Sequence, residues 1–175
     1  MKHYSFKVLL LGAPSVGKTS IFYRYVKNQF IHDYITTIGI NYLTKEITLD
    51  SKKIAKLVIL DIGGQKKFKF LRKKFYEGAN GALVIFDLTQ LKTYEAIEGW
   101  LSEMFEILQE NIPFIIIGNK LDLVKEFTRS VEKDIVKDYT ERKNSIYLET
   151  SAKTGENVEE VFKELTQRMI KRGSK

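Results

Sequence analysis

Short apolar segments alternate with longer amphipathic ones along most of the chain, and this order restricts the possible folds more than any other feature. Five of the apolar segments are short enough for strands that are buried on both faces. They span residues 7–12, 56–60, 81–88, 113–119 and 145–150. A sixth strand is predicted at 41–49, where apolar and polar side chains alternate, and a turn at Asp50 and Ser51 would fold it antiparallel onto 53–60.

Two stretches between these strands have the spacing of amphipathic helices. Apolar side chains recur every three or four residues from Ile97 to Leu108 and again from Val158 to Leu165. Strands separated by helices favour right-handed crossovers between parallel strands. The pattern therefore predicts an α/β fold, with a six-stranded, mostly parallel sheet and helices on both faces. In such a sheet the ligand site lies beyond the carboxyl ends of the strands.

Composition limits the class of protein without selecting one function. The chain has 175 residues, 43% of them hydrophobic, only two prolines and no evident linker, so we expect one domain over residues 1–175. It has no cysteine, which excludes disulfides, thiolate metal sites and cysteine-linked lipids. The apolar run at 8–11 is too short for a signal peptide or a membrane span, so we expect a soluble intracellular protein. The net charge of +7 favours an anionic partner, whether nucleotide, nucleic acid or membrane surface.

The sequence GAPSVGKT, residues 12–19, matches the pattern G-x-x-x-x-G-K-[ST] directly after a predicted strand and at the start of a helix. Such a loop points backbone N–H groups and a helix N-terminus at phosphate oxygens. Lys18 adds a positive charge, and Thr19 adds a hydroxyl group for magnesium. Pro14 lacks an N–H group, but most donors of the loop lie after it. The alternative is a glycine-rich turn with an incidental lysine. The residues expected to bind phosphate are Ser15, Val16, Gly17, Lys18, Thr19 and Ser20.

Two groups at the end of the strand 56–60 suit a phosphate that carries magnesium. The carboxylate of Asp61 can hold the ion through a water molecule, and Gly64 can bring an unobstructed N–H group to the terminal phosphate. The pattern D-x-x-G is a weak signal when it stands alone. A polar loop that caps a strand is the alternative interpretation.

The sequence NKLD, residues 119–122, predicts recognition of a base. The carboxylate of Asp122 can accept from both the N1 and N2 protons of guanine, which adenine does not present together. Asn119 would connect neighbouring loops, and the stem of Lys120 would cover the purine or the ribose. The last strand leads into TSAK, residues 150–153, which would offer the N–H of Ala152 to guanine O6. The neighbouring residues expected at the nucleotide are Ser151 and Lys153.

With GAPSVGKT, DIGGQ, NKLD and ETSAK in this order, the sequence resembles the Ras superfamily of small GTPases over essentially its whole length. The segment YITTIGINY, residues 34–42, looks most like the Rab branch. The resemblance implies a P-loop NTPase fold of the Ras-like G-domain type, in one small-GTPase domain. It also implies a Mg²⁺ cofactor, GTP as substrate, GDP as product, and a role in signalling or trafficking.

The same resemblance assigns roles to residues outside these motifs. Thr37 would close on magnesium and the γ-phosphate, Phe30 would lie edge-on against guanine, and Tyr34 would cover the phosphates. Phe30 and Tyr34 also fit the alternative of ordinary packing aromatics. Gln65 would position the attacking water while Lys18 and magnesium absorb charge on the phosphates. The expected catalytic residues are Gln65, Lys18 and Thr37, and the expected magnesium ligands are Thr19, Thr37 and, through water, Asp61.

Three features depart from the usual Ras and Rab pattern. Ile62 and Gly63 make the sequence DIGGQ look more like the Arf branch, although an Arf-type helix has no room before residue 7 and Gly is absent at position 2. The terminal residues GSK cannot be prenylated, so the chain is either a lipid-free member, as in the Ran branch, or a shortened form. Pro14 stands close to the expected catalytic water, and it bears on the rate of hydrolysis more than on nucleotide binding.

The resemblance implies a switch that hydrolyses GTP slowly, because no arginine of the chain itself is evident that would assist hydrolysis. An arginine donated by another protein would raise the rate of hydrolysis roughly 10³–10⁵-fold. Thr37 and the N–H of Gly64 would both contact the γ-phosphate, so its loss would release two loops. Effectors, an exchange factor and a GTPase-activating protein would bind through residues 30–42 and 62–77. We expect a monomer in the cytoplasm, with no nucleic acid and at most peripheral, anchor-free contact with a membrane.

A basic run follows Gln65 and therefore belongs to the second switch. On a helix, Phe68, Leu71 and Phe75 would form one inward stripe, and Phe70 would fall among the bases. An outward Phe70 predicts an acidic, state-dependent protein partner with this ring as its anchor. The alternative is a solvated basic face with Phe70 turned inward. The bases are Lys66, Lys67, Lys69, Arg72, Lys73 and Lys74.

Three other functions remain open from the residues alone. The first is a nucleotide-binding scaffold that does not hydrolyse, which Gln65 disfavours and Pro14 allows. The second is a nucleic-acid-binding domain, which the charge favours but no RRM, KH or helix-turn-helix signature supports. The third is a P-loop ATPase or kinase, which Asp122 disfavours.

Overall fold

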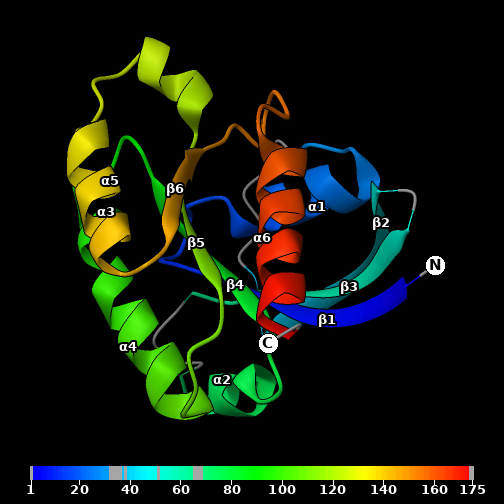
Figure 1. Ribbon diagram of the computed structural model, residues 1–175. Helices are drawn as coiled ribbons and strands as arrows, with labels where there is room; N and C mark the ends of the chain where they lie inside the picture. The colour runs from blue at the N-terminus through cyan, green and yellow to red at the C-terminus, as the bar shows by residue number, and fades with distance from the viewer. Residues whose placement is uncertain (1, 32–36, 38, 51, 65–68, 174–175) are drawn as a thin grey trace.

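The structure is a computed structural model that describes residues 2–31, 37, 39–50, 52–64 and 69–173 (Figure 1). Its sheet has six strands in the order β2-β3-β1-β4-β5-β6. Every neighbouring pair is parallel except β2 with β3, which pair antiparallel. The six predicted strands and the mostly parallel sheet are therefore confirmed. The strands are β1 (Lys2–Leu11), β2 (Ile40–Asp50), β3 (Lys53–Ile62), β4 (Gly81–Asp87), β5 (Phe114–Asn119) and β6 (Ile146–Glu149).

Helices connect the strands and cover both faces of the sheet. They are α1 (Lys18–Lys27), α2 (Lys69–Tyr76), α3 (Leu91–Glu95), α4 (Ile97–Leu108), α5 (Lys133–Arg142) and α6 (Val158–Gly173), with a 3₁₀ turn η2 (Leu121–Lys125). The two predicted helical stripes are α4 and α6. Periodicity does not reveal α5, because Val136 and Thr140 are the residues that it buries. Within the described residues, no helix combines the length and apolar character that a membrane crossing requires.

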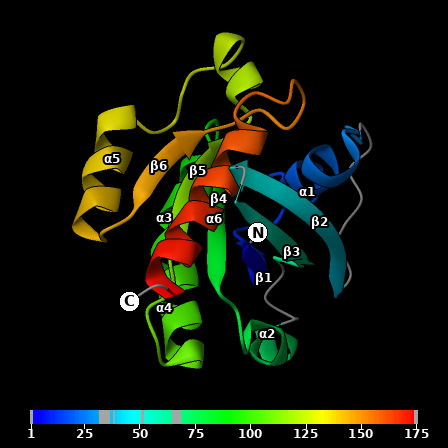
Figure 2. The ribbon, with the colours of Figure 1, turned by 45° about the vertical axis from the view of Figure 1, so that its right-hand side comes forward.

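Alternate residues of the central strands point into two separate cores. Val8 and Leu10 pack on the face that α1 and α6 cover, together with Phe162. Leu9 and Leu11 pack on the opposite face, which carries α2, α4 and α5. In the turned view of Figure 2, α2 and α4 lie together, away from α1. The sheet is therefore buried on both sides, as its continuous apolar strands predict.

Strand β1 begins five residues before the predicted start at residue 7. Its first residues pair with the start of β3, from Lys2 opposite Lys53 onward. Tyr4 and Phe6 are half-buried there, and their rings stack with centroids 5.8 Å apart. Exposed and half-buried side chains are mixed in this part of the strand, so it lacks the apolar run that marks residues 7–12.

Helix α2 corrects part of the prediction for the basic run. Phe70 is 78% exposed, so the interpretation in which it turns inward is wrong. Arg72 is only 4% exposed, so it does not belong to a solvated face, whereas Lys73 and Lys74 are exposed. Phe75 is half-buried against the core, as the inward stripe requires. Phe68, Lys66 and Lys67 lie outside the described residues, and so do the side chains of Lys69 and Leu71.

The buried arginine joins α2 to α4 through a carboxylate. Arg72 Nε donates to Glu103 Oε1 at 2.6 Å, and Arg72 Nη2 donates to Glu103 Oε2 at 2.8 Å. Tyr76 donates to Glu103 Oε1 at 3.0 Å, and the guanidinium carbon lies 4.6 Å from the centre of the Trp100 ring. Burial and the Glu103 carboxylate raise the pKa of Tyr76, which keeps its hydroxyl a donor. We call these four residues the α2–α4 clasp.

The topology determines where a ligand can bind. From β1 the chain leads through α1 to β2 and β3 on one side, and from β4 it leads to β5 and β6 on the other. The carboxyl ends of β1 and β4 therefore meet at the point where the strand order reverses, which is where open α/β sheets bind ligands.

Candidate functional site

The loop that follows β1 is shaped by positions that exclude a side chain. Gly12 and Gly17 have positive φ angles of 143° and 97°. A Cβ atom on Gly12 would lie 2.2 Å from the carbonyl oxygen of Ile85, and one on Gly17 would lie 2.2 Å from Asn119 Nδ2. Both glycines of the GAPSVGKT pattern are therefore required by the strands that stand next to the loop.

We expect Gly17→Ala to weaken the binding of GDP, the ligand that the sequence predicts, roughly ten- to hundredfold, because the new Cβ must displace Asn119 and adopt a strained φ. Fluorescence titration with a labelled GDP measures the change. Gly99→Ala is the matched control, since a Cβ there meets nothing within 4 Å. An unchanged affinity in Gly17→Ala would contradict this reading of the loop.

Lys18 lies under the loop as a buried cation. It is 6% exposed, and its Nζ donates to the carbonyl oxygens of Gly12 at 2.8 Å and Ala13 at 2.7 Å. Burial lowers the pKa of Lys18 to about 8, although the Asp61 carboxylate acts in the opposite direction. An anion held by the loop would favour the charged form of this lysine. The position therefore suits a phosphate ligand.

Three oxygen-bearing side chains converge beside this lysine. Thr19 Oγ1 donates to Asp61 Oδ2 at 2.5 Å and lies 2.8 Å from Thr37 Oγ1, which is itself 3.5 Å from the same carboxylate oxygen. The other oxygen, Asp61 Oδ1, is buried and has no hydrogen-bond partner among the described residues. Burial raises the pKa of the Asp61 carboxyl, which indicates that a cation beside it would be favourable. Carboxylate and hydroxyl oxygens are ligands that Mg²⁺ prefers, so the predicted ligand set fits this ion.

The start of the second predicted switch contacts both the loop and the first switch. A Cβ atom on Gly64 would lie 2.6 Å from the carbonyl oxygen of Gly12 and 2.8 Å from the nitrogen of Pro14. The N–H of Gly63 donates to the carbonyl oxygen of Gly39 at 3.0 Å. The two predicted switches are therefore joined at the edge of the loop. Tyr34 and Gln65 lie outside the described residues, so their roles stay predictions.

A cavity of about 300 Å³ extends from the loop to the NKLD and TSAK segments. Such a volume is at the lower end of the range for small-molecule sites. Eight of its nine lining residues are ones that the sequence predicts at a nucleotide, and Leu123 is the ninth. The cavity is lined by Gly17, Ser20, Phe30, Asn119, Lys120, Asp122, Leu123, Ala152 and Lys153.

Asn119 connects three loops around this cavity. Its Nδ2 donates to the carbonyl oxygen of Val16 at 2.9 Å, while its Oδ1 accepts from Thr150 Oγ1 at 3.0 Å and from the N–H of Ala152 at 3.2 Å. The Ala152 N–H, which the sequence analysis assigns to guanine O6, thus makes a long hydrogen bond to Asn119 within the chain. Its contact with a base stays a prediction.

The carboxylate of Asp122 and the ammonium of Lys120 are each held by one neighbour. Ser151 Oγ donates to Asp122 Oδ1 at 2.5 Å, which fixes the orientation of the carboxylate at the cavity wall. Lys120 Nζ lies 2.7 Å from Asp87 Oδ2, at the carboxyl end of β4. The φ angle of 69° at Lys120 turns the chain from β5 into η2 and so places both side chains at the cavity.

Three residues at this site are not among the predicted ones. Leu123 directly follows Asp122, and the sequence feature that could have indicated it is an apolar residue in a polar loop. Asp87 is the residue before last of the predicted strand 81–88 and the last residue of β4, so a carboxylate near a strand end was the sequence feature that could have indicated it. Arg24, in the middle of α1, donates to the carbonyl oxygens of Ala152 and Lys153. No local pattern indicates Arg24, because its partners are 128 and 129 residues away.

Comparison with known proteins identifies the family. The model of the Ras family matches residues 7–171. Ras-related protein RabJ of Dictyostelium discoideum is 41% identical over 164 residues, RABA1h of Arabidopsis thaliana is 40% identical over 165, and Rab-21 of Homo sapiens is 38% identical over 167. These alignments cover 94%, 94% and 95% of this chain, and 63%, 74% and 73% of the relatives. The chain thus spans less than two thirds of RabJ. Its motifs, its sheet order and these alignments agree, and the chain belongs to the Ras family of small GTPases, with Rab-like relatives.

Proposed function

We propose that this protein is a guanine-nucleotide switch that binds GTP and GDP with Mg²⁺ and slowly hydrolyses GTP to GDP and phosphate. One observation carries the proposal: a single cavity is lined both by Gly17 of the phosphate-binding loop and by Asp122 of NKLD. A ligand that suits both would have phosphates at the end near Gly17 and a pair of hydrogen-bond donors at the end near Asp122. A guanine nucleotide has both.

The base end of the cavity supports the choice of guanine. The Asp122 carboxylate, oriented by Ser151, can accept from the N1 and N2 protons, which distinguishes guanine from adenine. The N–H of Ala152 would share its proton between Asn119 and guanine O6, as three-centre hydrogen bonds do. Phe30 would cover the ring edge, and the stem of Lys120 would cover its face.

The phosphate end supplies charge and hydrogen-bond donors. Residues 15–20 would give backbone N–H groups, and Lys18 would leave its two loop carbonyls for the phosphate oxygens. Mg²⁺, held by Thr19 and Thr37 and through water by Asp61, would neutralise charge that develops on the phosphates. Gln65 would orient the attacking water. Loss of the γ-phosphate would free Thr37 and Gly64, and the bond between Gly63 and Gly39 would couple the two segments.

The same segments are the proposed contacts for other proteins. Effectors, an exchange factor and a GTPase-activating protein would bind residues 30–42 and 62–77, and the exposed Phe70 is the proposed anchor for an acidic partner. We propose a monomer in the cytoplasm with at most peripheral membrane contact and no nucleic-acid ligand.

Purified protein tests the proposal in two steps. We expect the nucleotide extracted from it to be guanosine di- or triphosphate, and emptied protein to prefer guanosine over adenosine diphosphate in isothermal titration. In single turnover with Mg²⁺, phosphate release should be slow, on the order of 10⁻⁴–10⁻³ s⁻¹, because no arginine is donated. Equal affinity for the two diphosphates would contradict the proposed base site. Guanine binding without phosphate release would instead support the non-hydrolysing scaffold that Pro14 allows.

A further inference from the structure

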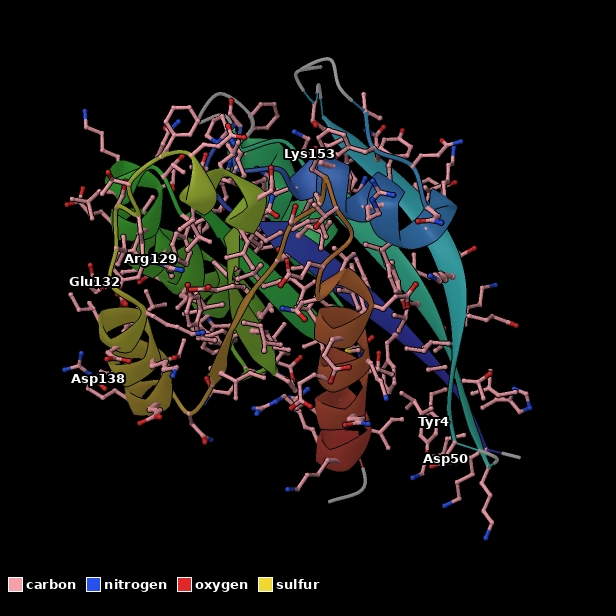
Figure 3. All side chains as sticks on the ribbon, turned by 90° about the horizontal axis from the view of Figure 1, so that it is seen from above. Tyr4, Asp50, Arg129, Glu132, Asp138 and Lys153 are labelled. Atoms are coloured by element: carbon pink, nitrogen blue, oxygen red, sulfur yellow. The ribbon has the colours of Figure 1, made fainter. Side chains whose placement is uncertain are left out.

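Arg24 connects α1 to the loop that follows β6, far away in the sequence. Its Nε donates to the carbonyl oxygen of Ala152 at 2.8 Å, and its Nη2 donates to that of Lys153 at 2.7 Å. The planar guanidinium thus holds two consecutive carbonyl groups in a fork, a geometry that lysine cannot reproduce. In Figure 3 the labelled Lys153 lies on this loop beside α1.

The same side chain also reaches the end of its own helix. Arg24 Nη1 lies 3.4 Å from the carbonyl oxygen of Asn28 and 3.3 Å from Asn28 Oδ1. Asn28 ends α1 in a left-handed conformation with a φ of 52°, and two residues later the chain reaches Phe30. Phe30 and Ala152 line the same cavity. The Arg24 guanidinium therefore joins the two segments that carry Phe30 and Ala152, which line the part of the cavity proposed for the base.

The contacts continue from this loop to the residue proposed to read the base. Ser151, next to Ala152, donates to Asp122 and accepts from the N–H of Thr154. Arg24 does not itself line the cavity, and its three nitrogens are directed at the chain. We therefore expect it to act on a ligand through the loop that it fixes.

We propose that Arg24 is a positioning residue that sets how long a guanine nucleotide stays bound, by holding the Ala152 N–H against the base. The inference rests on the proposed function. Hydrogen bonds from a charged donor are strong enough that losing this fork should raise the dissociation rate constant of GDP roughly ten- to hundredfold. The hydrogen bonds of Arg24 go to Ala152, Lys153 and Asn28 rather than to the phosphate-binding loop, so the change should depend on the base.

The test uses the full chain with bound N-methylanthraniloyl-GDP, chased with unlabelled GDP in the presence of Mg²⁺. We expect ten- to hundredfold faster release from Arg24→Ala. Arg24→Lys should also release faster than the unaltered protein, because one ammonium group cannot hold both carbonyls. Arg168→Ala, which removes an arginine paired with Glu164 on the surface of α6, is the matched control and should not change the rate.

A second measurement separates positioning from a general loss of structure. The 5′-diphosphate of 6-thioguanosine keeps the phosphates, N1–H and the 2-amino group but has sulfur, a weaker hydrogen-bond acceptor, in place of O6. In the unaltered protein it should bind less tightly than GDP, and Arg24→Ala should reduce that ratio towards one. An equal loss of affinity for both nucleotides would overturn the inference.

The two proposals fail in different ways. Unchanged release and an unchanged ratio in Arg24→Ala, while the unaltered protein still prefers guanosine to adenosine diphosphate, would overturn the role of Arg24 and leave the proposed function standing. Absence of that preference in the unaltered protein would overturn both.

Discussion

Replacing Asp122 with Asn is expected to transfer the preference of the protein from guanine to xanthine nucleotides, by a factor on the order of 10⁴. Xanthine has a carbonyl group at C2 where guanine has an amino group, so the Asn amide can donate to it while its oxygen accepts from N1–H. Ser151 Oγ donates to Asp122 Oδ1 at 2.5 Å, and the same bond to the amide oxygen would point the new NH₂ group at C2.

Competition between xanthosine diphosphate (XDP) and GDP for binding to nucleotide-free protein measures this change of base preference. Asp134→Asn is the matched control, because it removes the same charge from an exposed position of α5 and should keep the guanine preference. If Asp122→Asn still selects GDP as strongly as the unaltered protein does, the carboxylate does not read the base and the assignment of NKLD is wrong.

Glu103→Ala should lower the free energy of unfolding by about 3–5 kcal/mol, the usual cost of removing one partner of a buried ion pair. The side chains of Arg72 and Glu103 are only 5% and 11% exposed, and Glu103 accepts from both Arg72 and Tyr76. The substitution leaves the α2–α4 clasp without its only carboxylate. Urea unfolding at a fixed, saturating GDP concentration measures the change without a contribution from altered ligand occupancy.

An exposed ion pair gives the control for this prediction. Glu110→Ala removes the partner of Arg172, where both side chains are more than 40% exposed, and should cost no more than about 1 kcal/mol. The triple substitution Arg72→Met, Glu103→Leu and Tyr76→Phe should recover most of the lost stability, because apolar side chains need no compensation of charge and the Tyr76 hydroxyl that Glu103 accepts from is removed as well. Similar losses for Glu103→Ala and Glu110→Ala would show that the clasp does not stabilise the fold.

Much of the fold and most of the candidate site were accessible from sequence because their signals are local. Each predicted motif follows a strand, and parallel strands bring their carboxyl ends to one edge, so Gly17 and Asp122 can be expected to share a cavity. The structure shows that they do. The covering of the phosphates by Tyr34 and the positioning of water by Gln65 stay predictions, because both residues lie outside the described part of the chain.

The remaining features depend on contacts between residues that are far apart in the sequence, which local sequence patterns do not predict. Arg24 binds carbonyl groups 128 and 129 residues away, and Arg72 binds a carboxylate 31 residues away. In the sequence Arg72 is one base among six, and nothing local separates it from Lys73 and Lys74. Its burial follows from the position of Glu103 on α4, which only the tertiary structure supplies.

The early start of β1 has a practical consequence for experiments on an immobilised molecule. Ten residues of strand span roughly 33 Å, and Lys2 begins at the end opposite the one that leads into Gly12. Figure 3 shows Tyr4 and Asp50 together at the far side from Lys153. A tether or fluorescent reporter attached ahead of Lys2 would therefore leave the nucleotide entrance facing the bulk solution, which suits single-molecule measurements of nucleotide exchange.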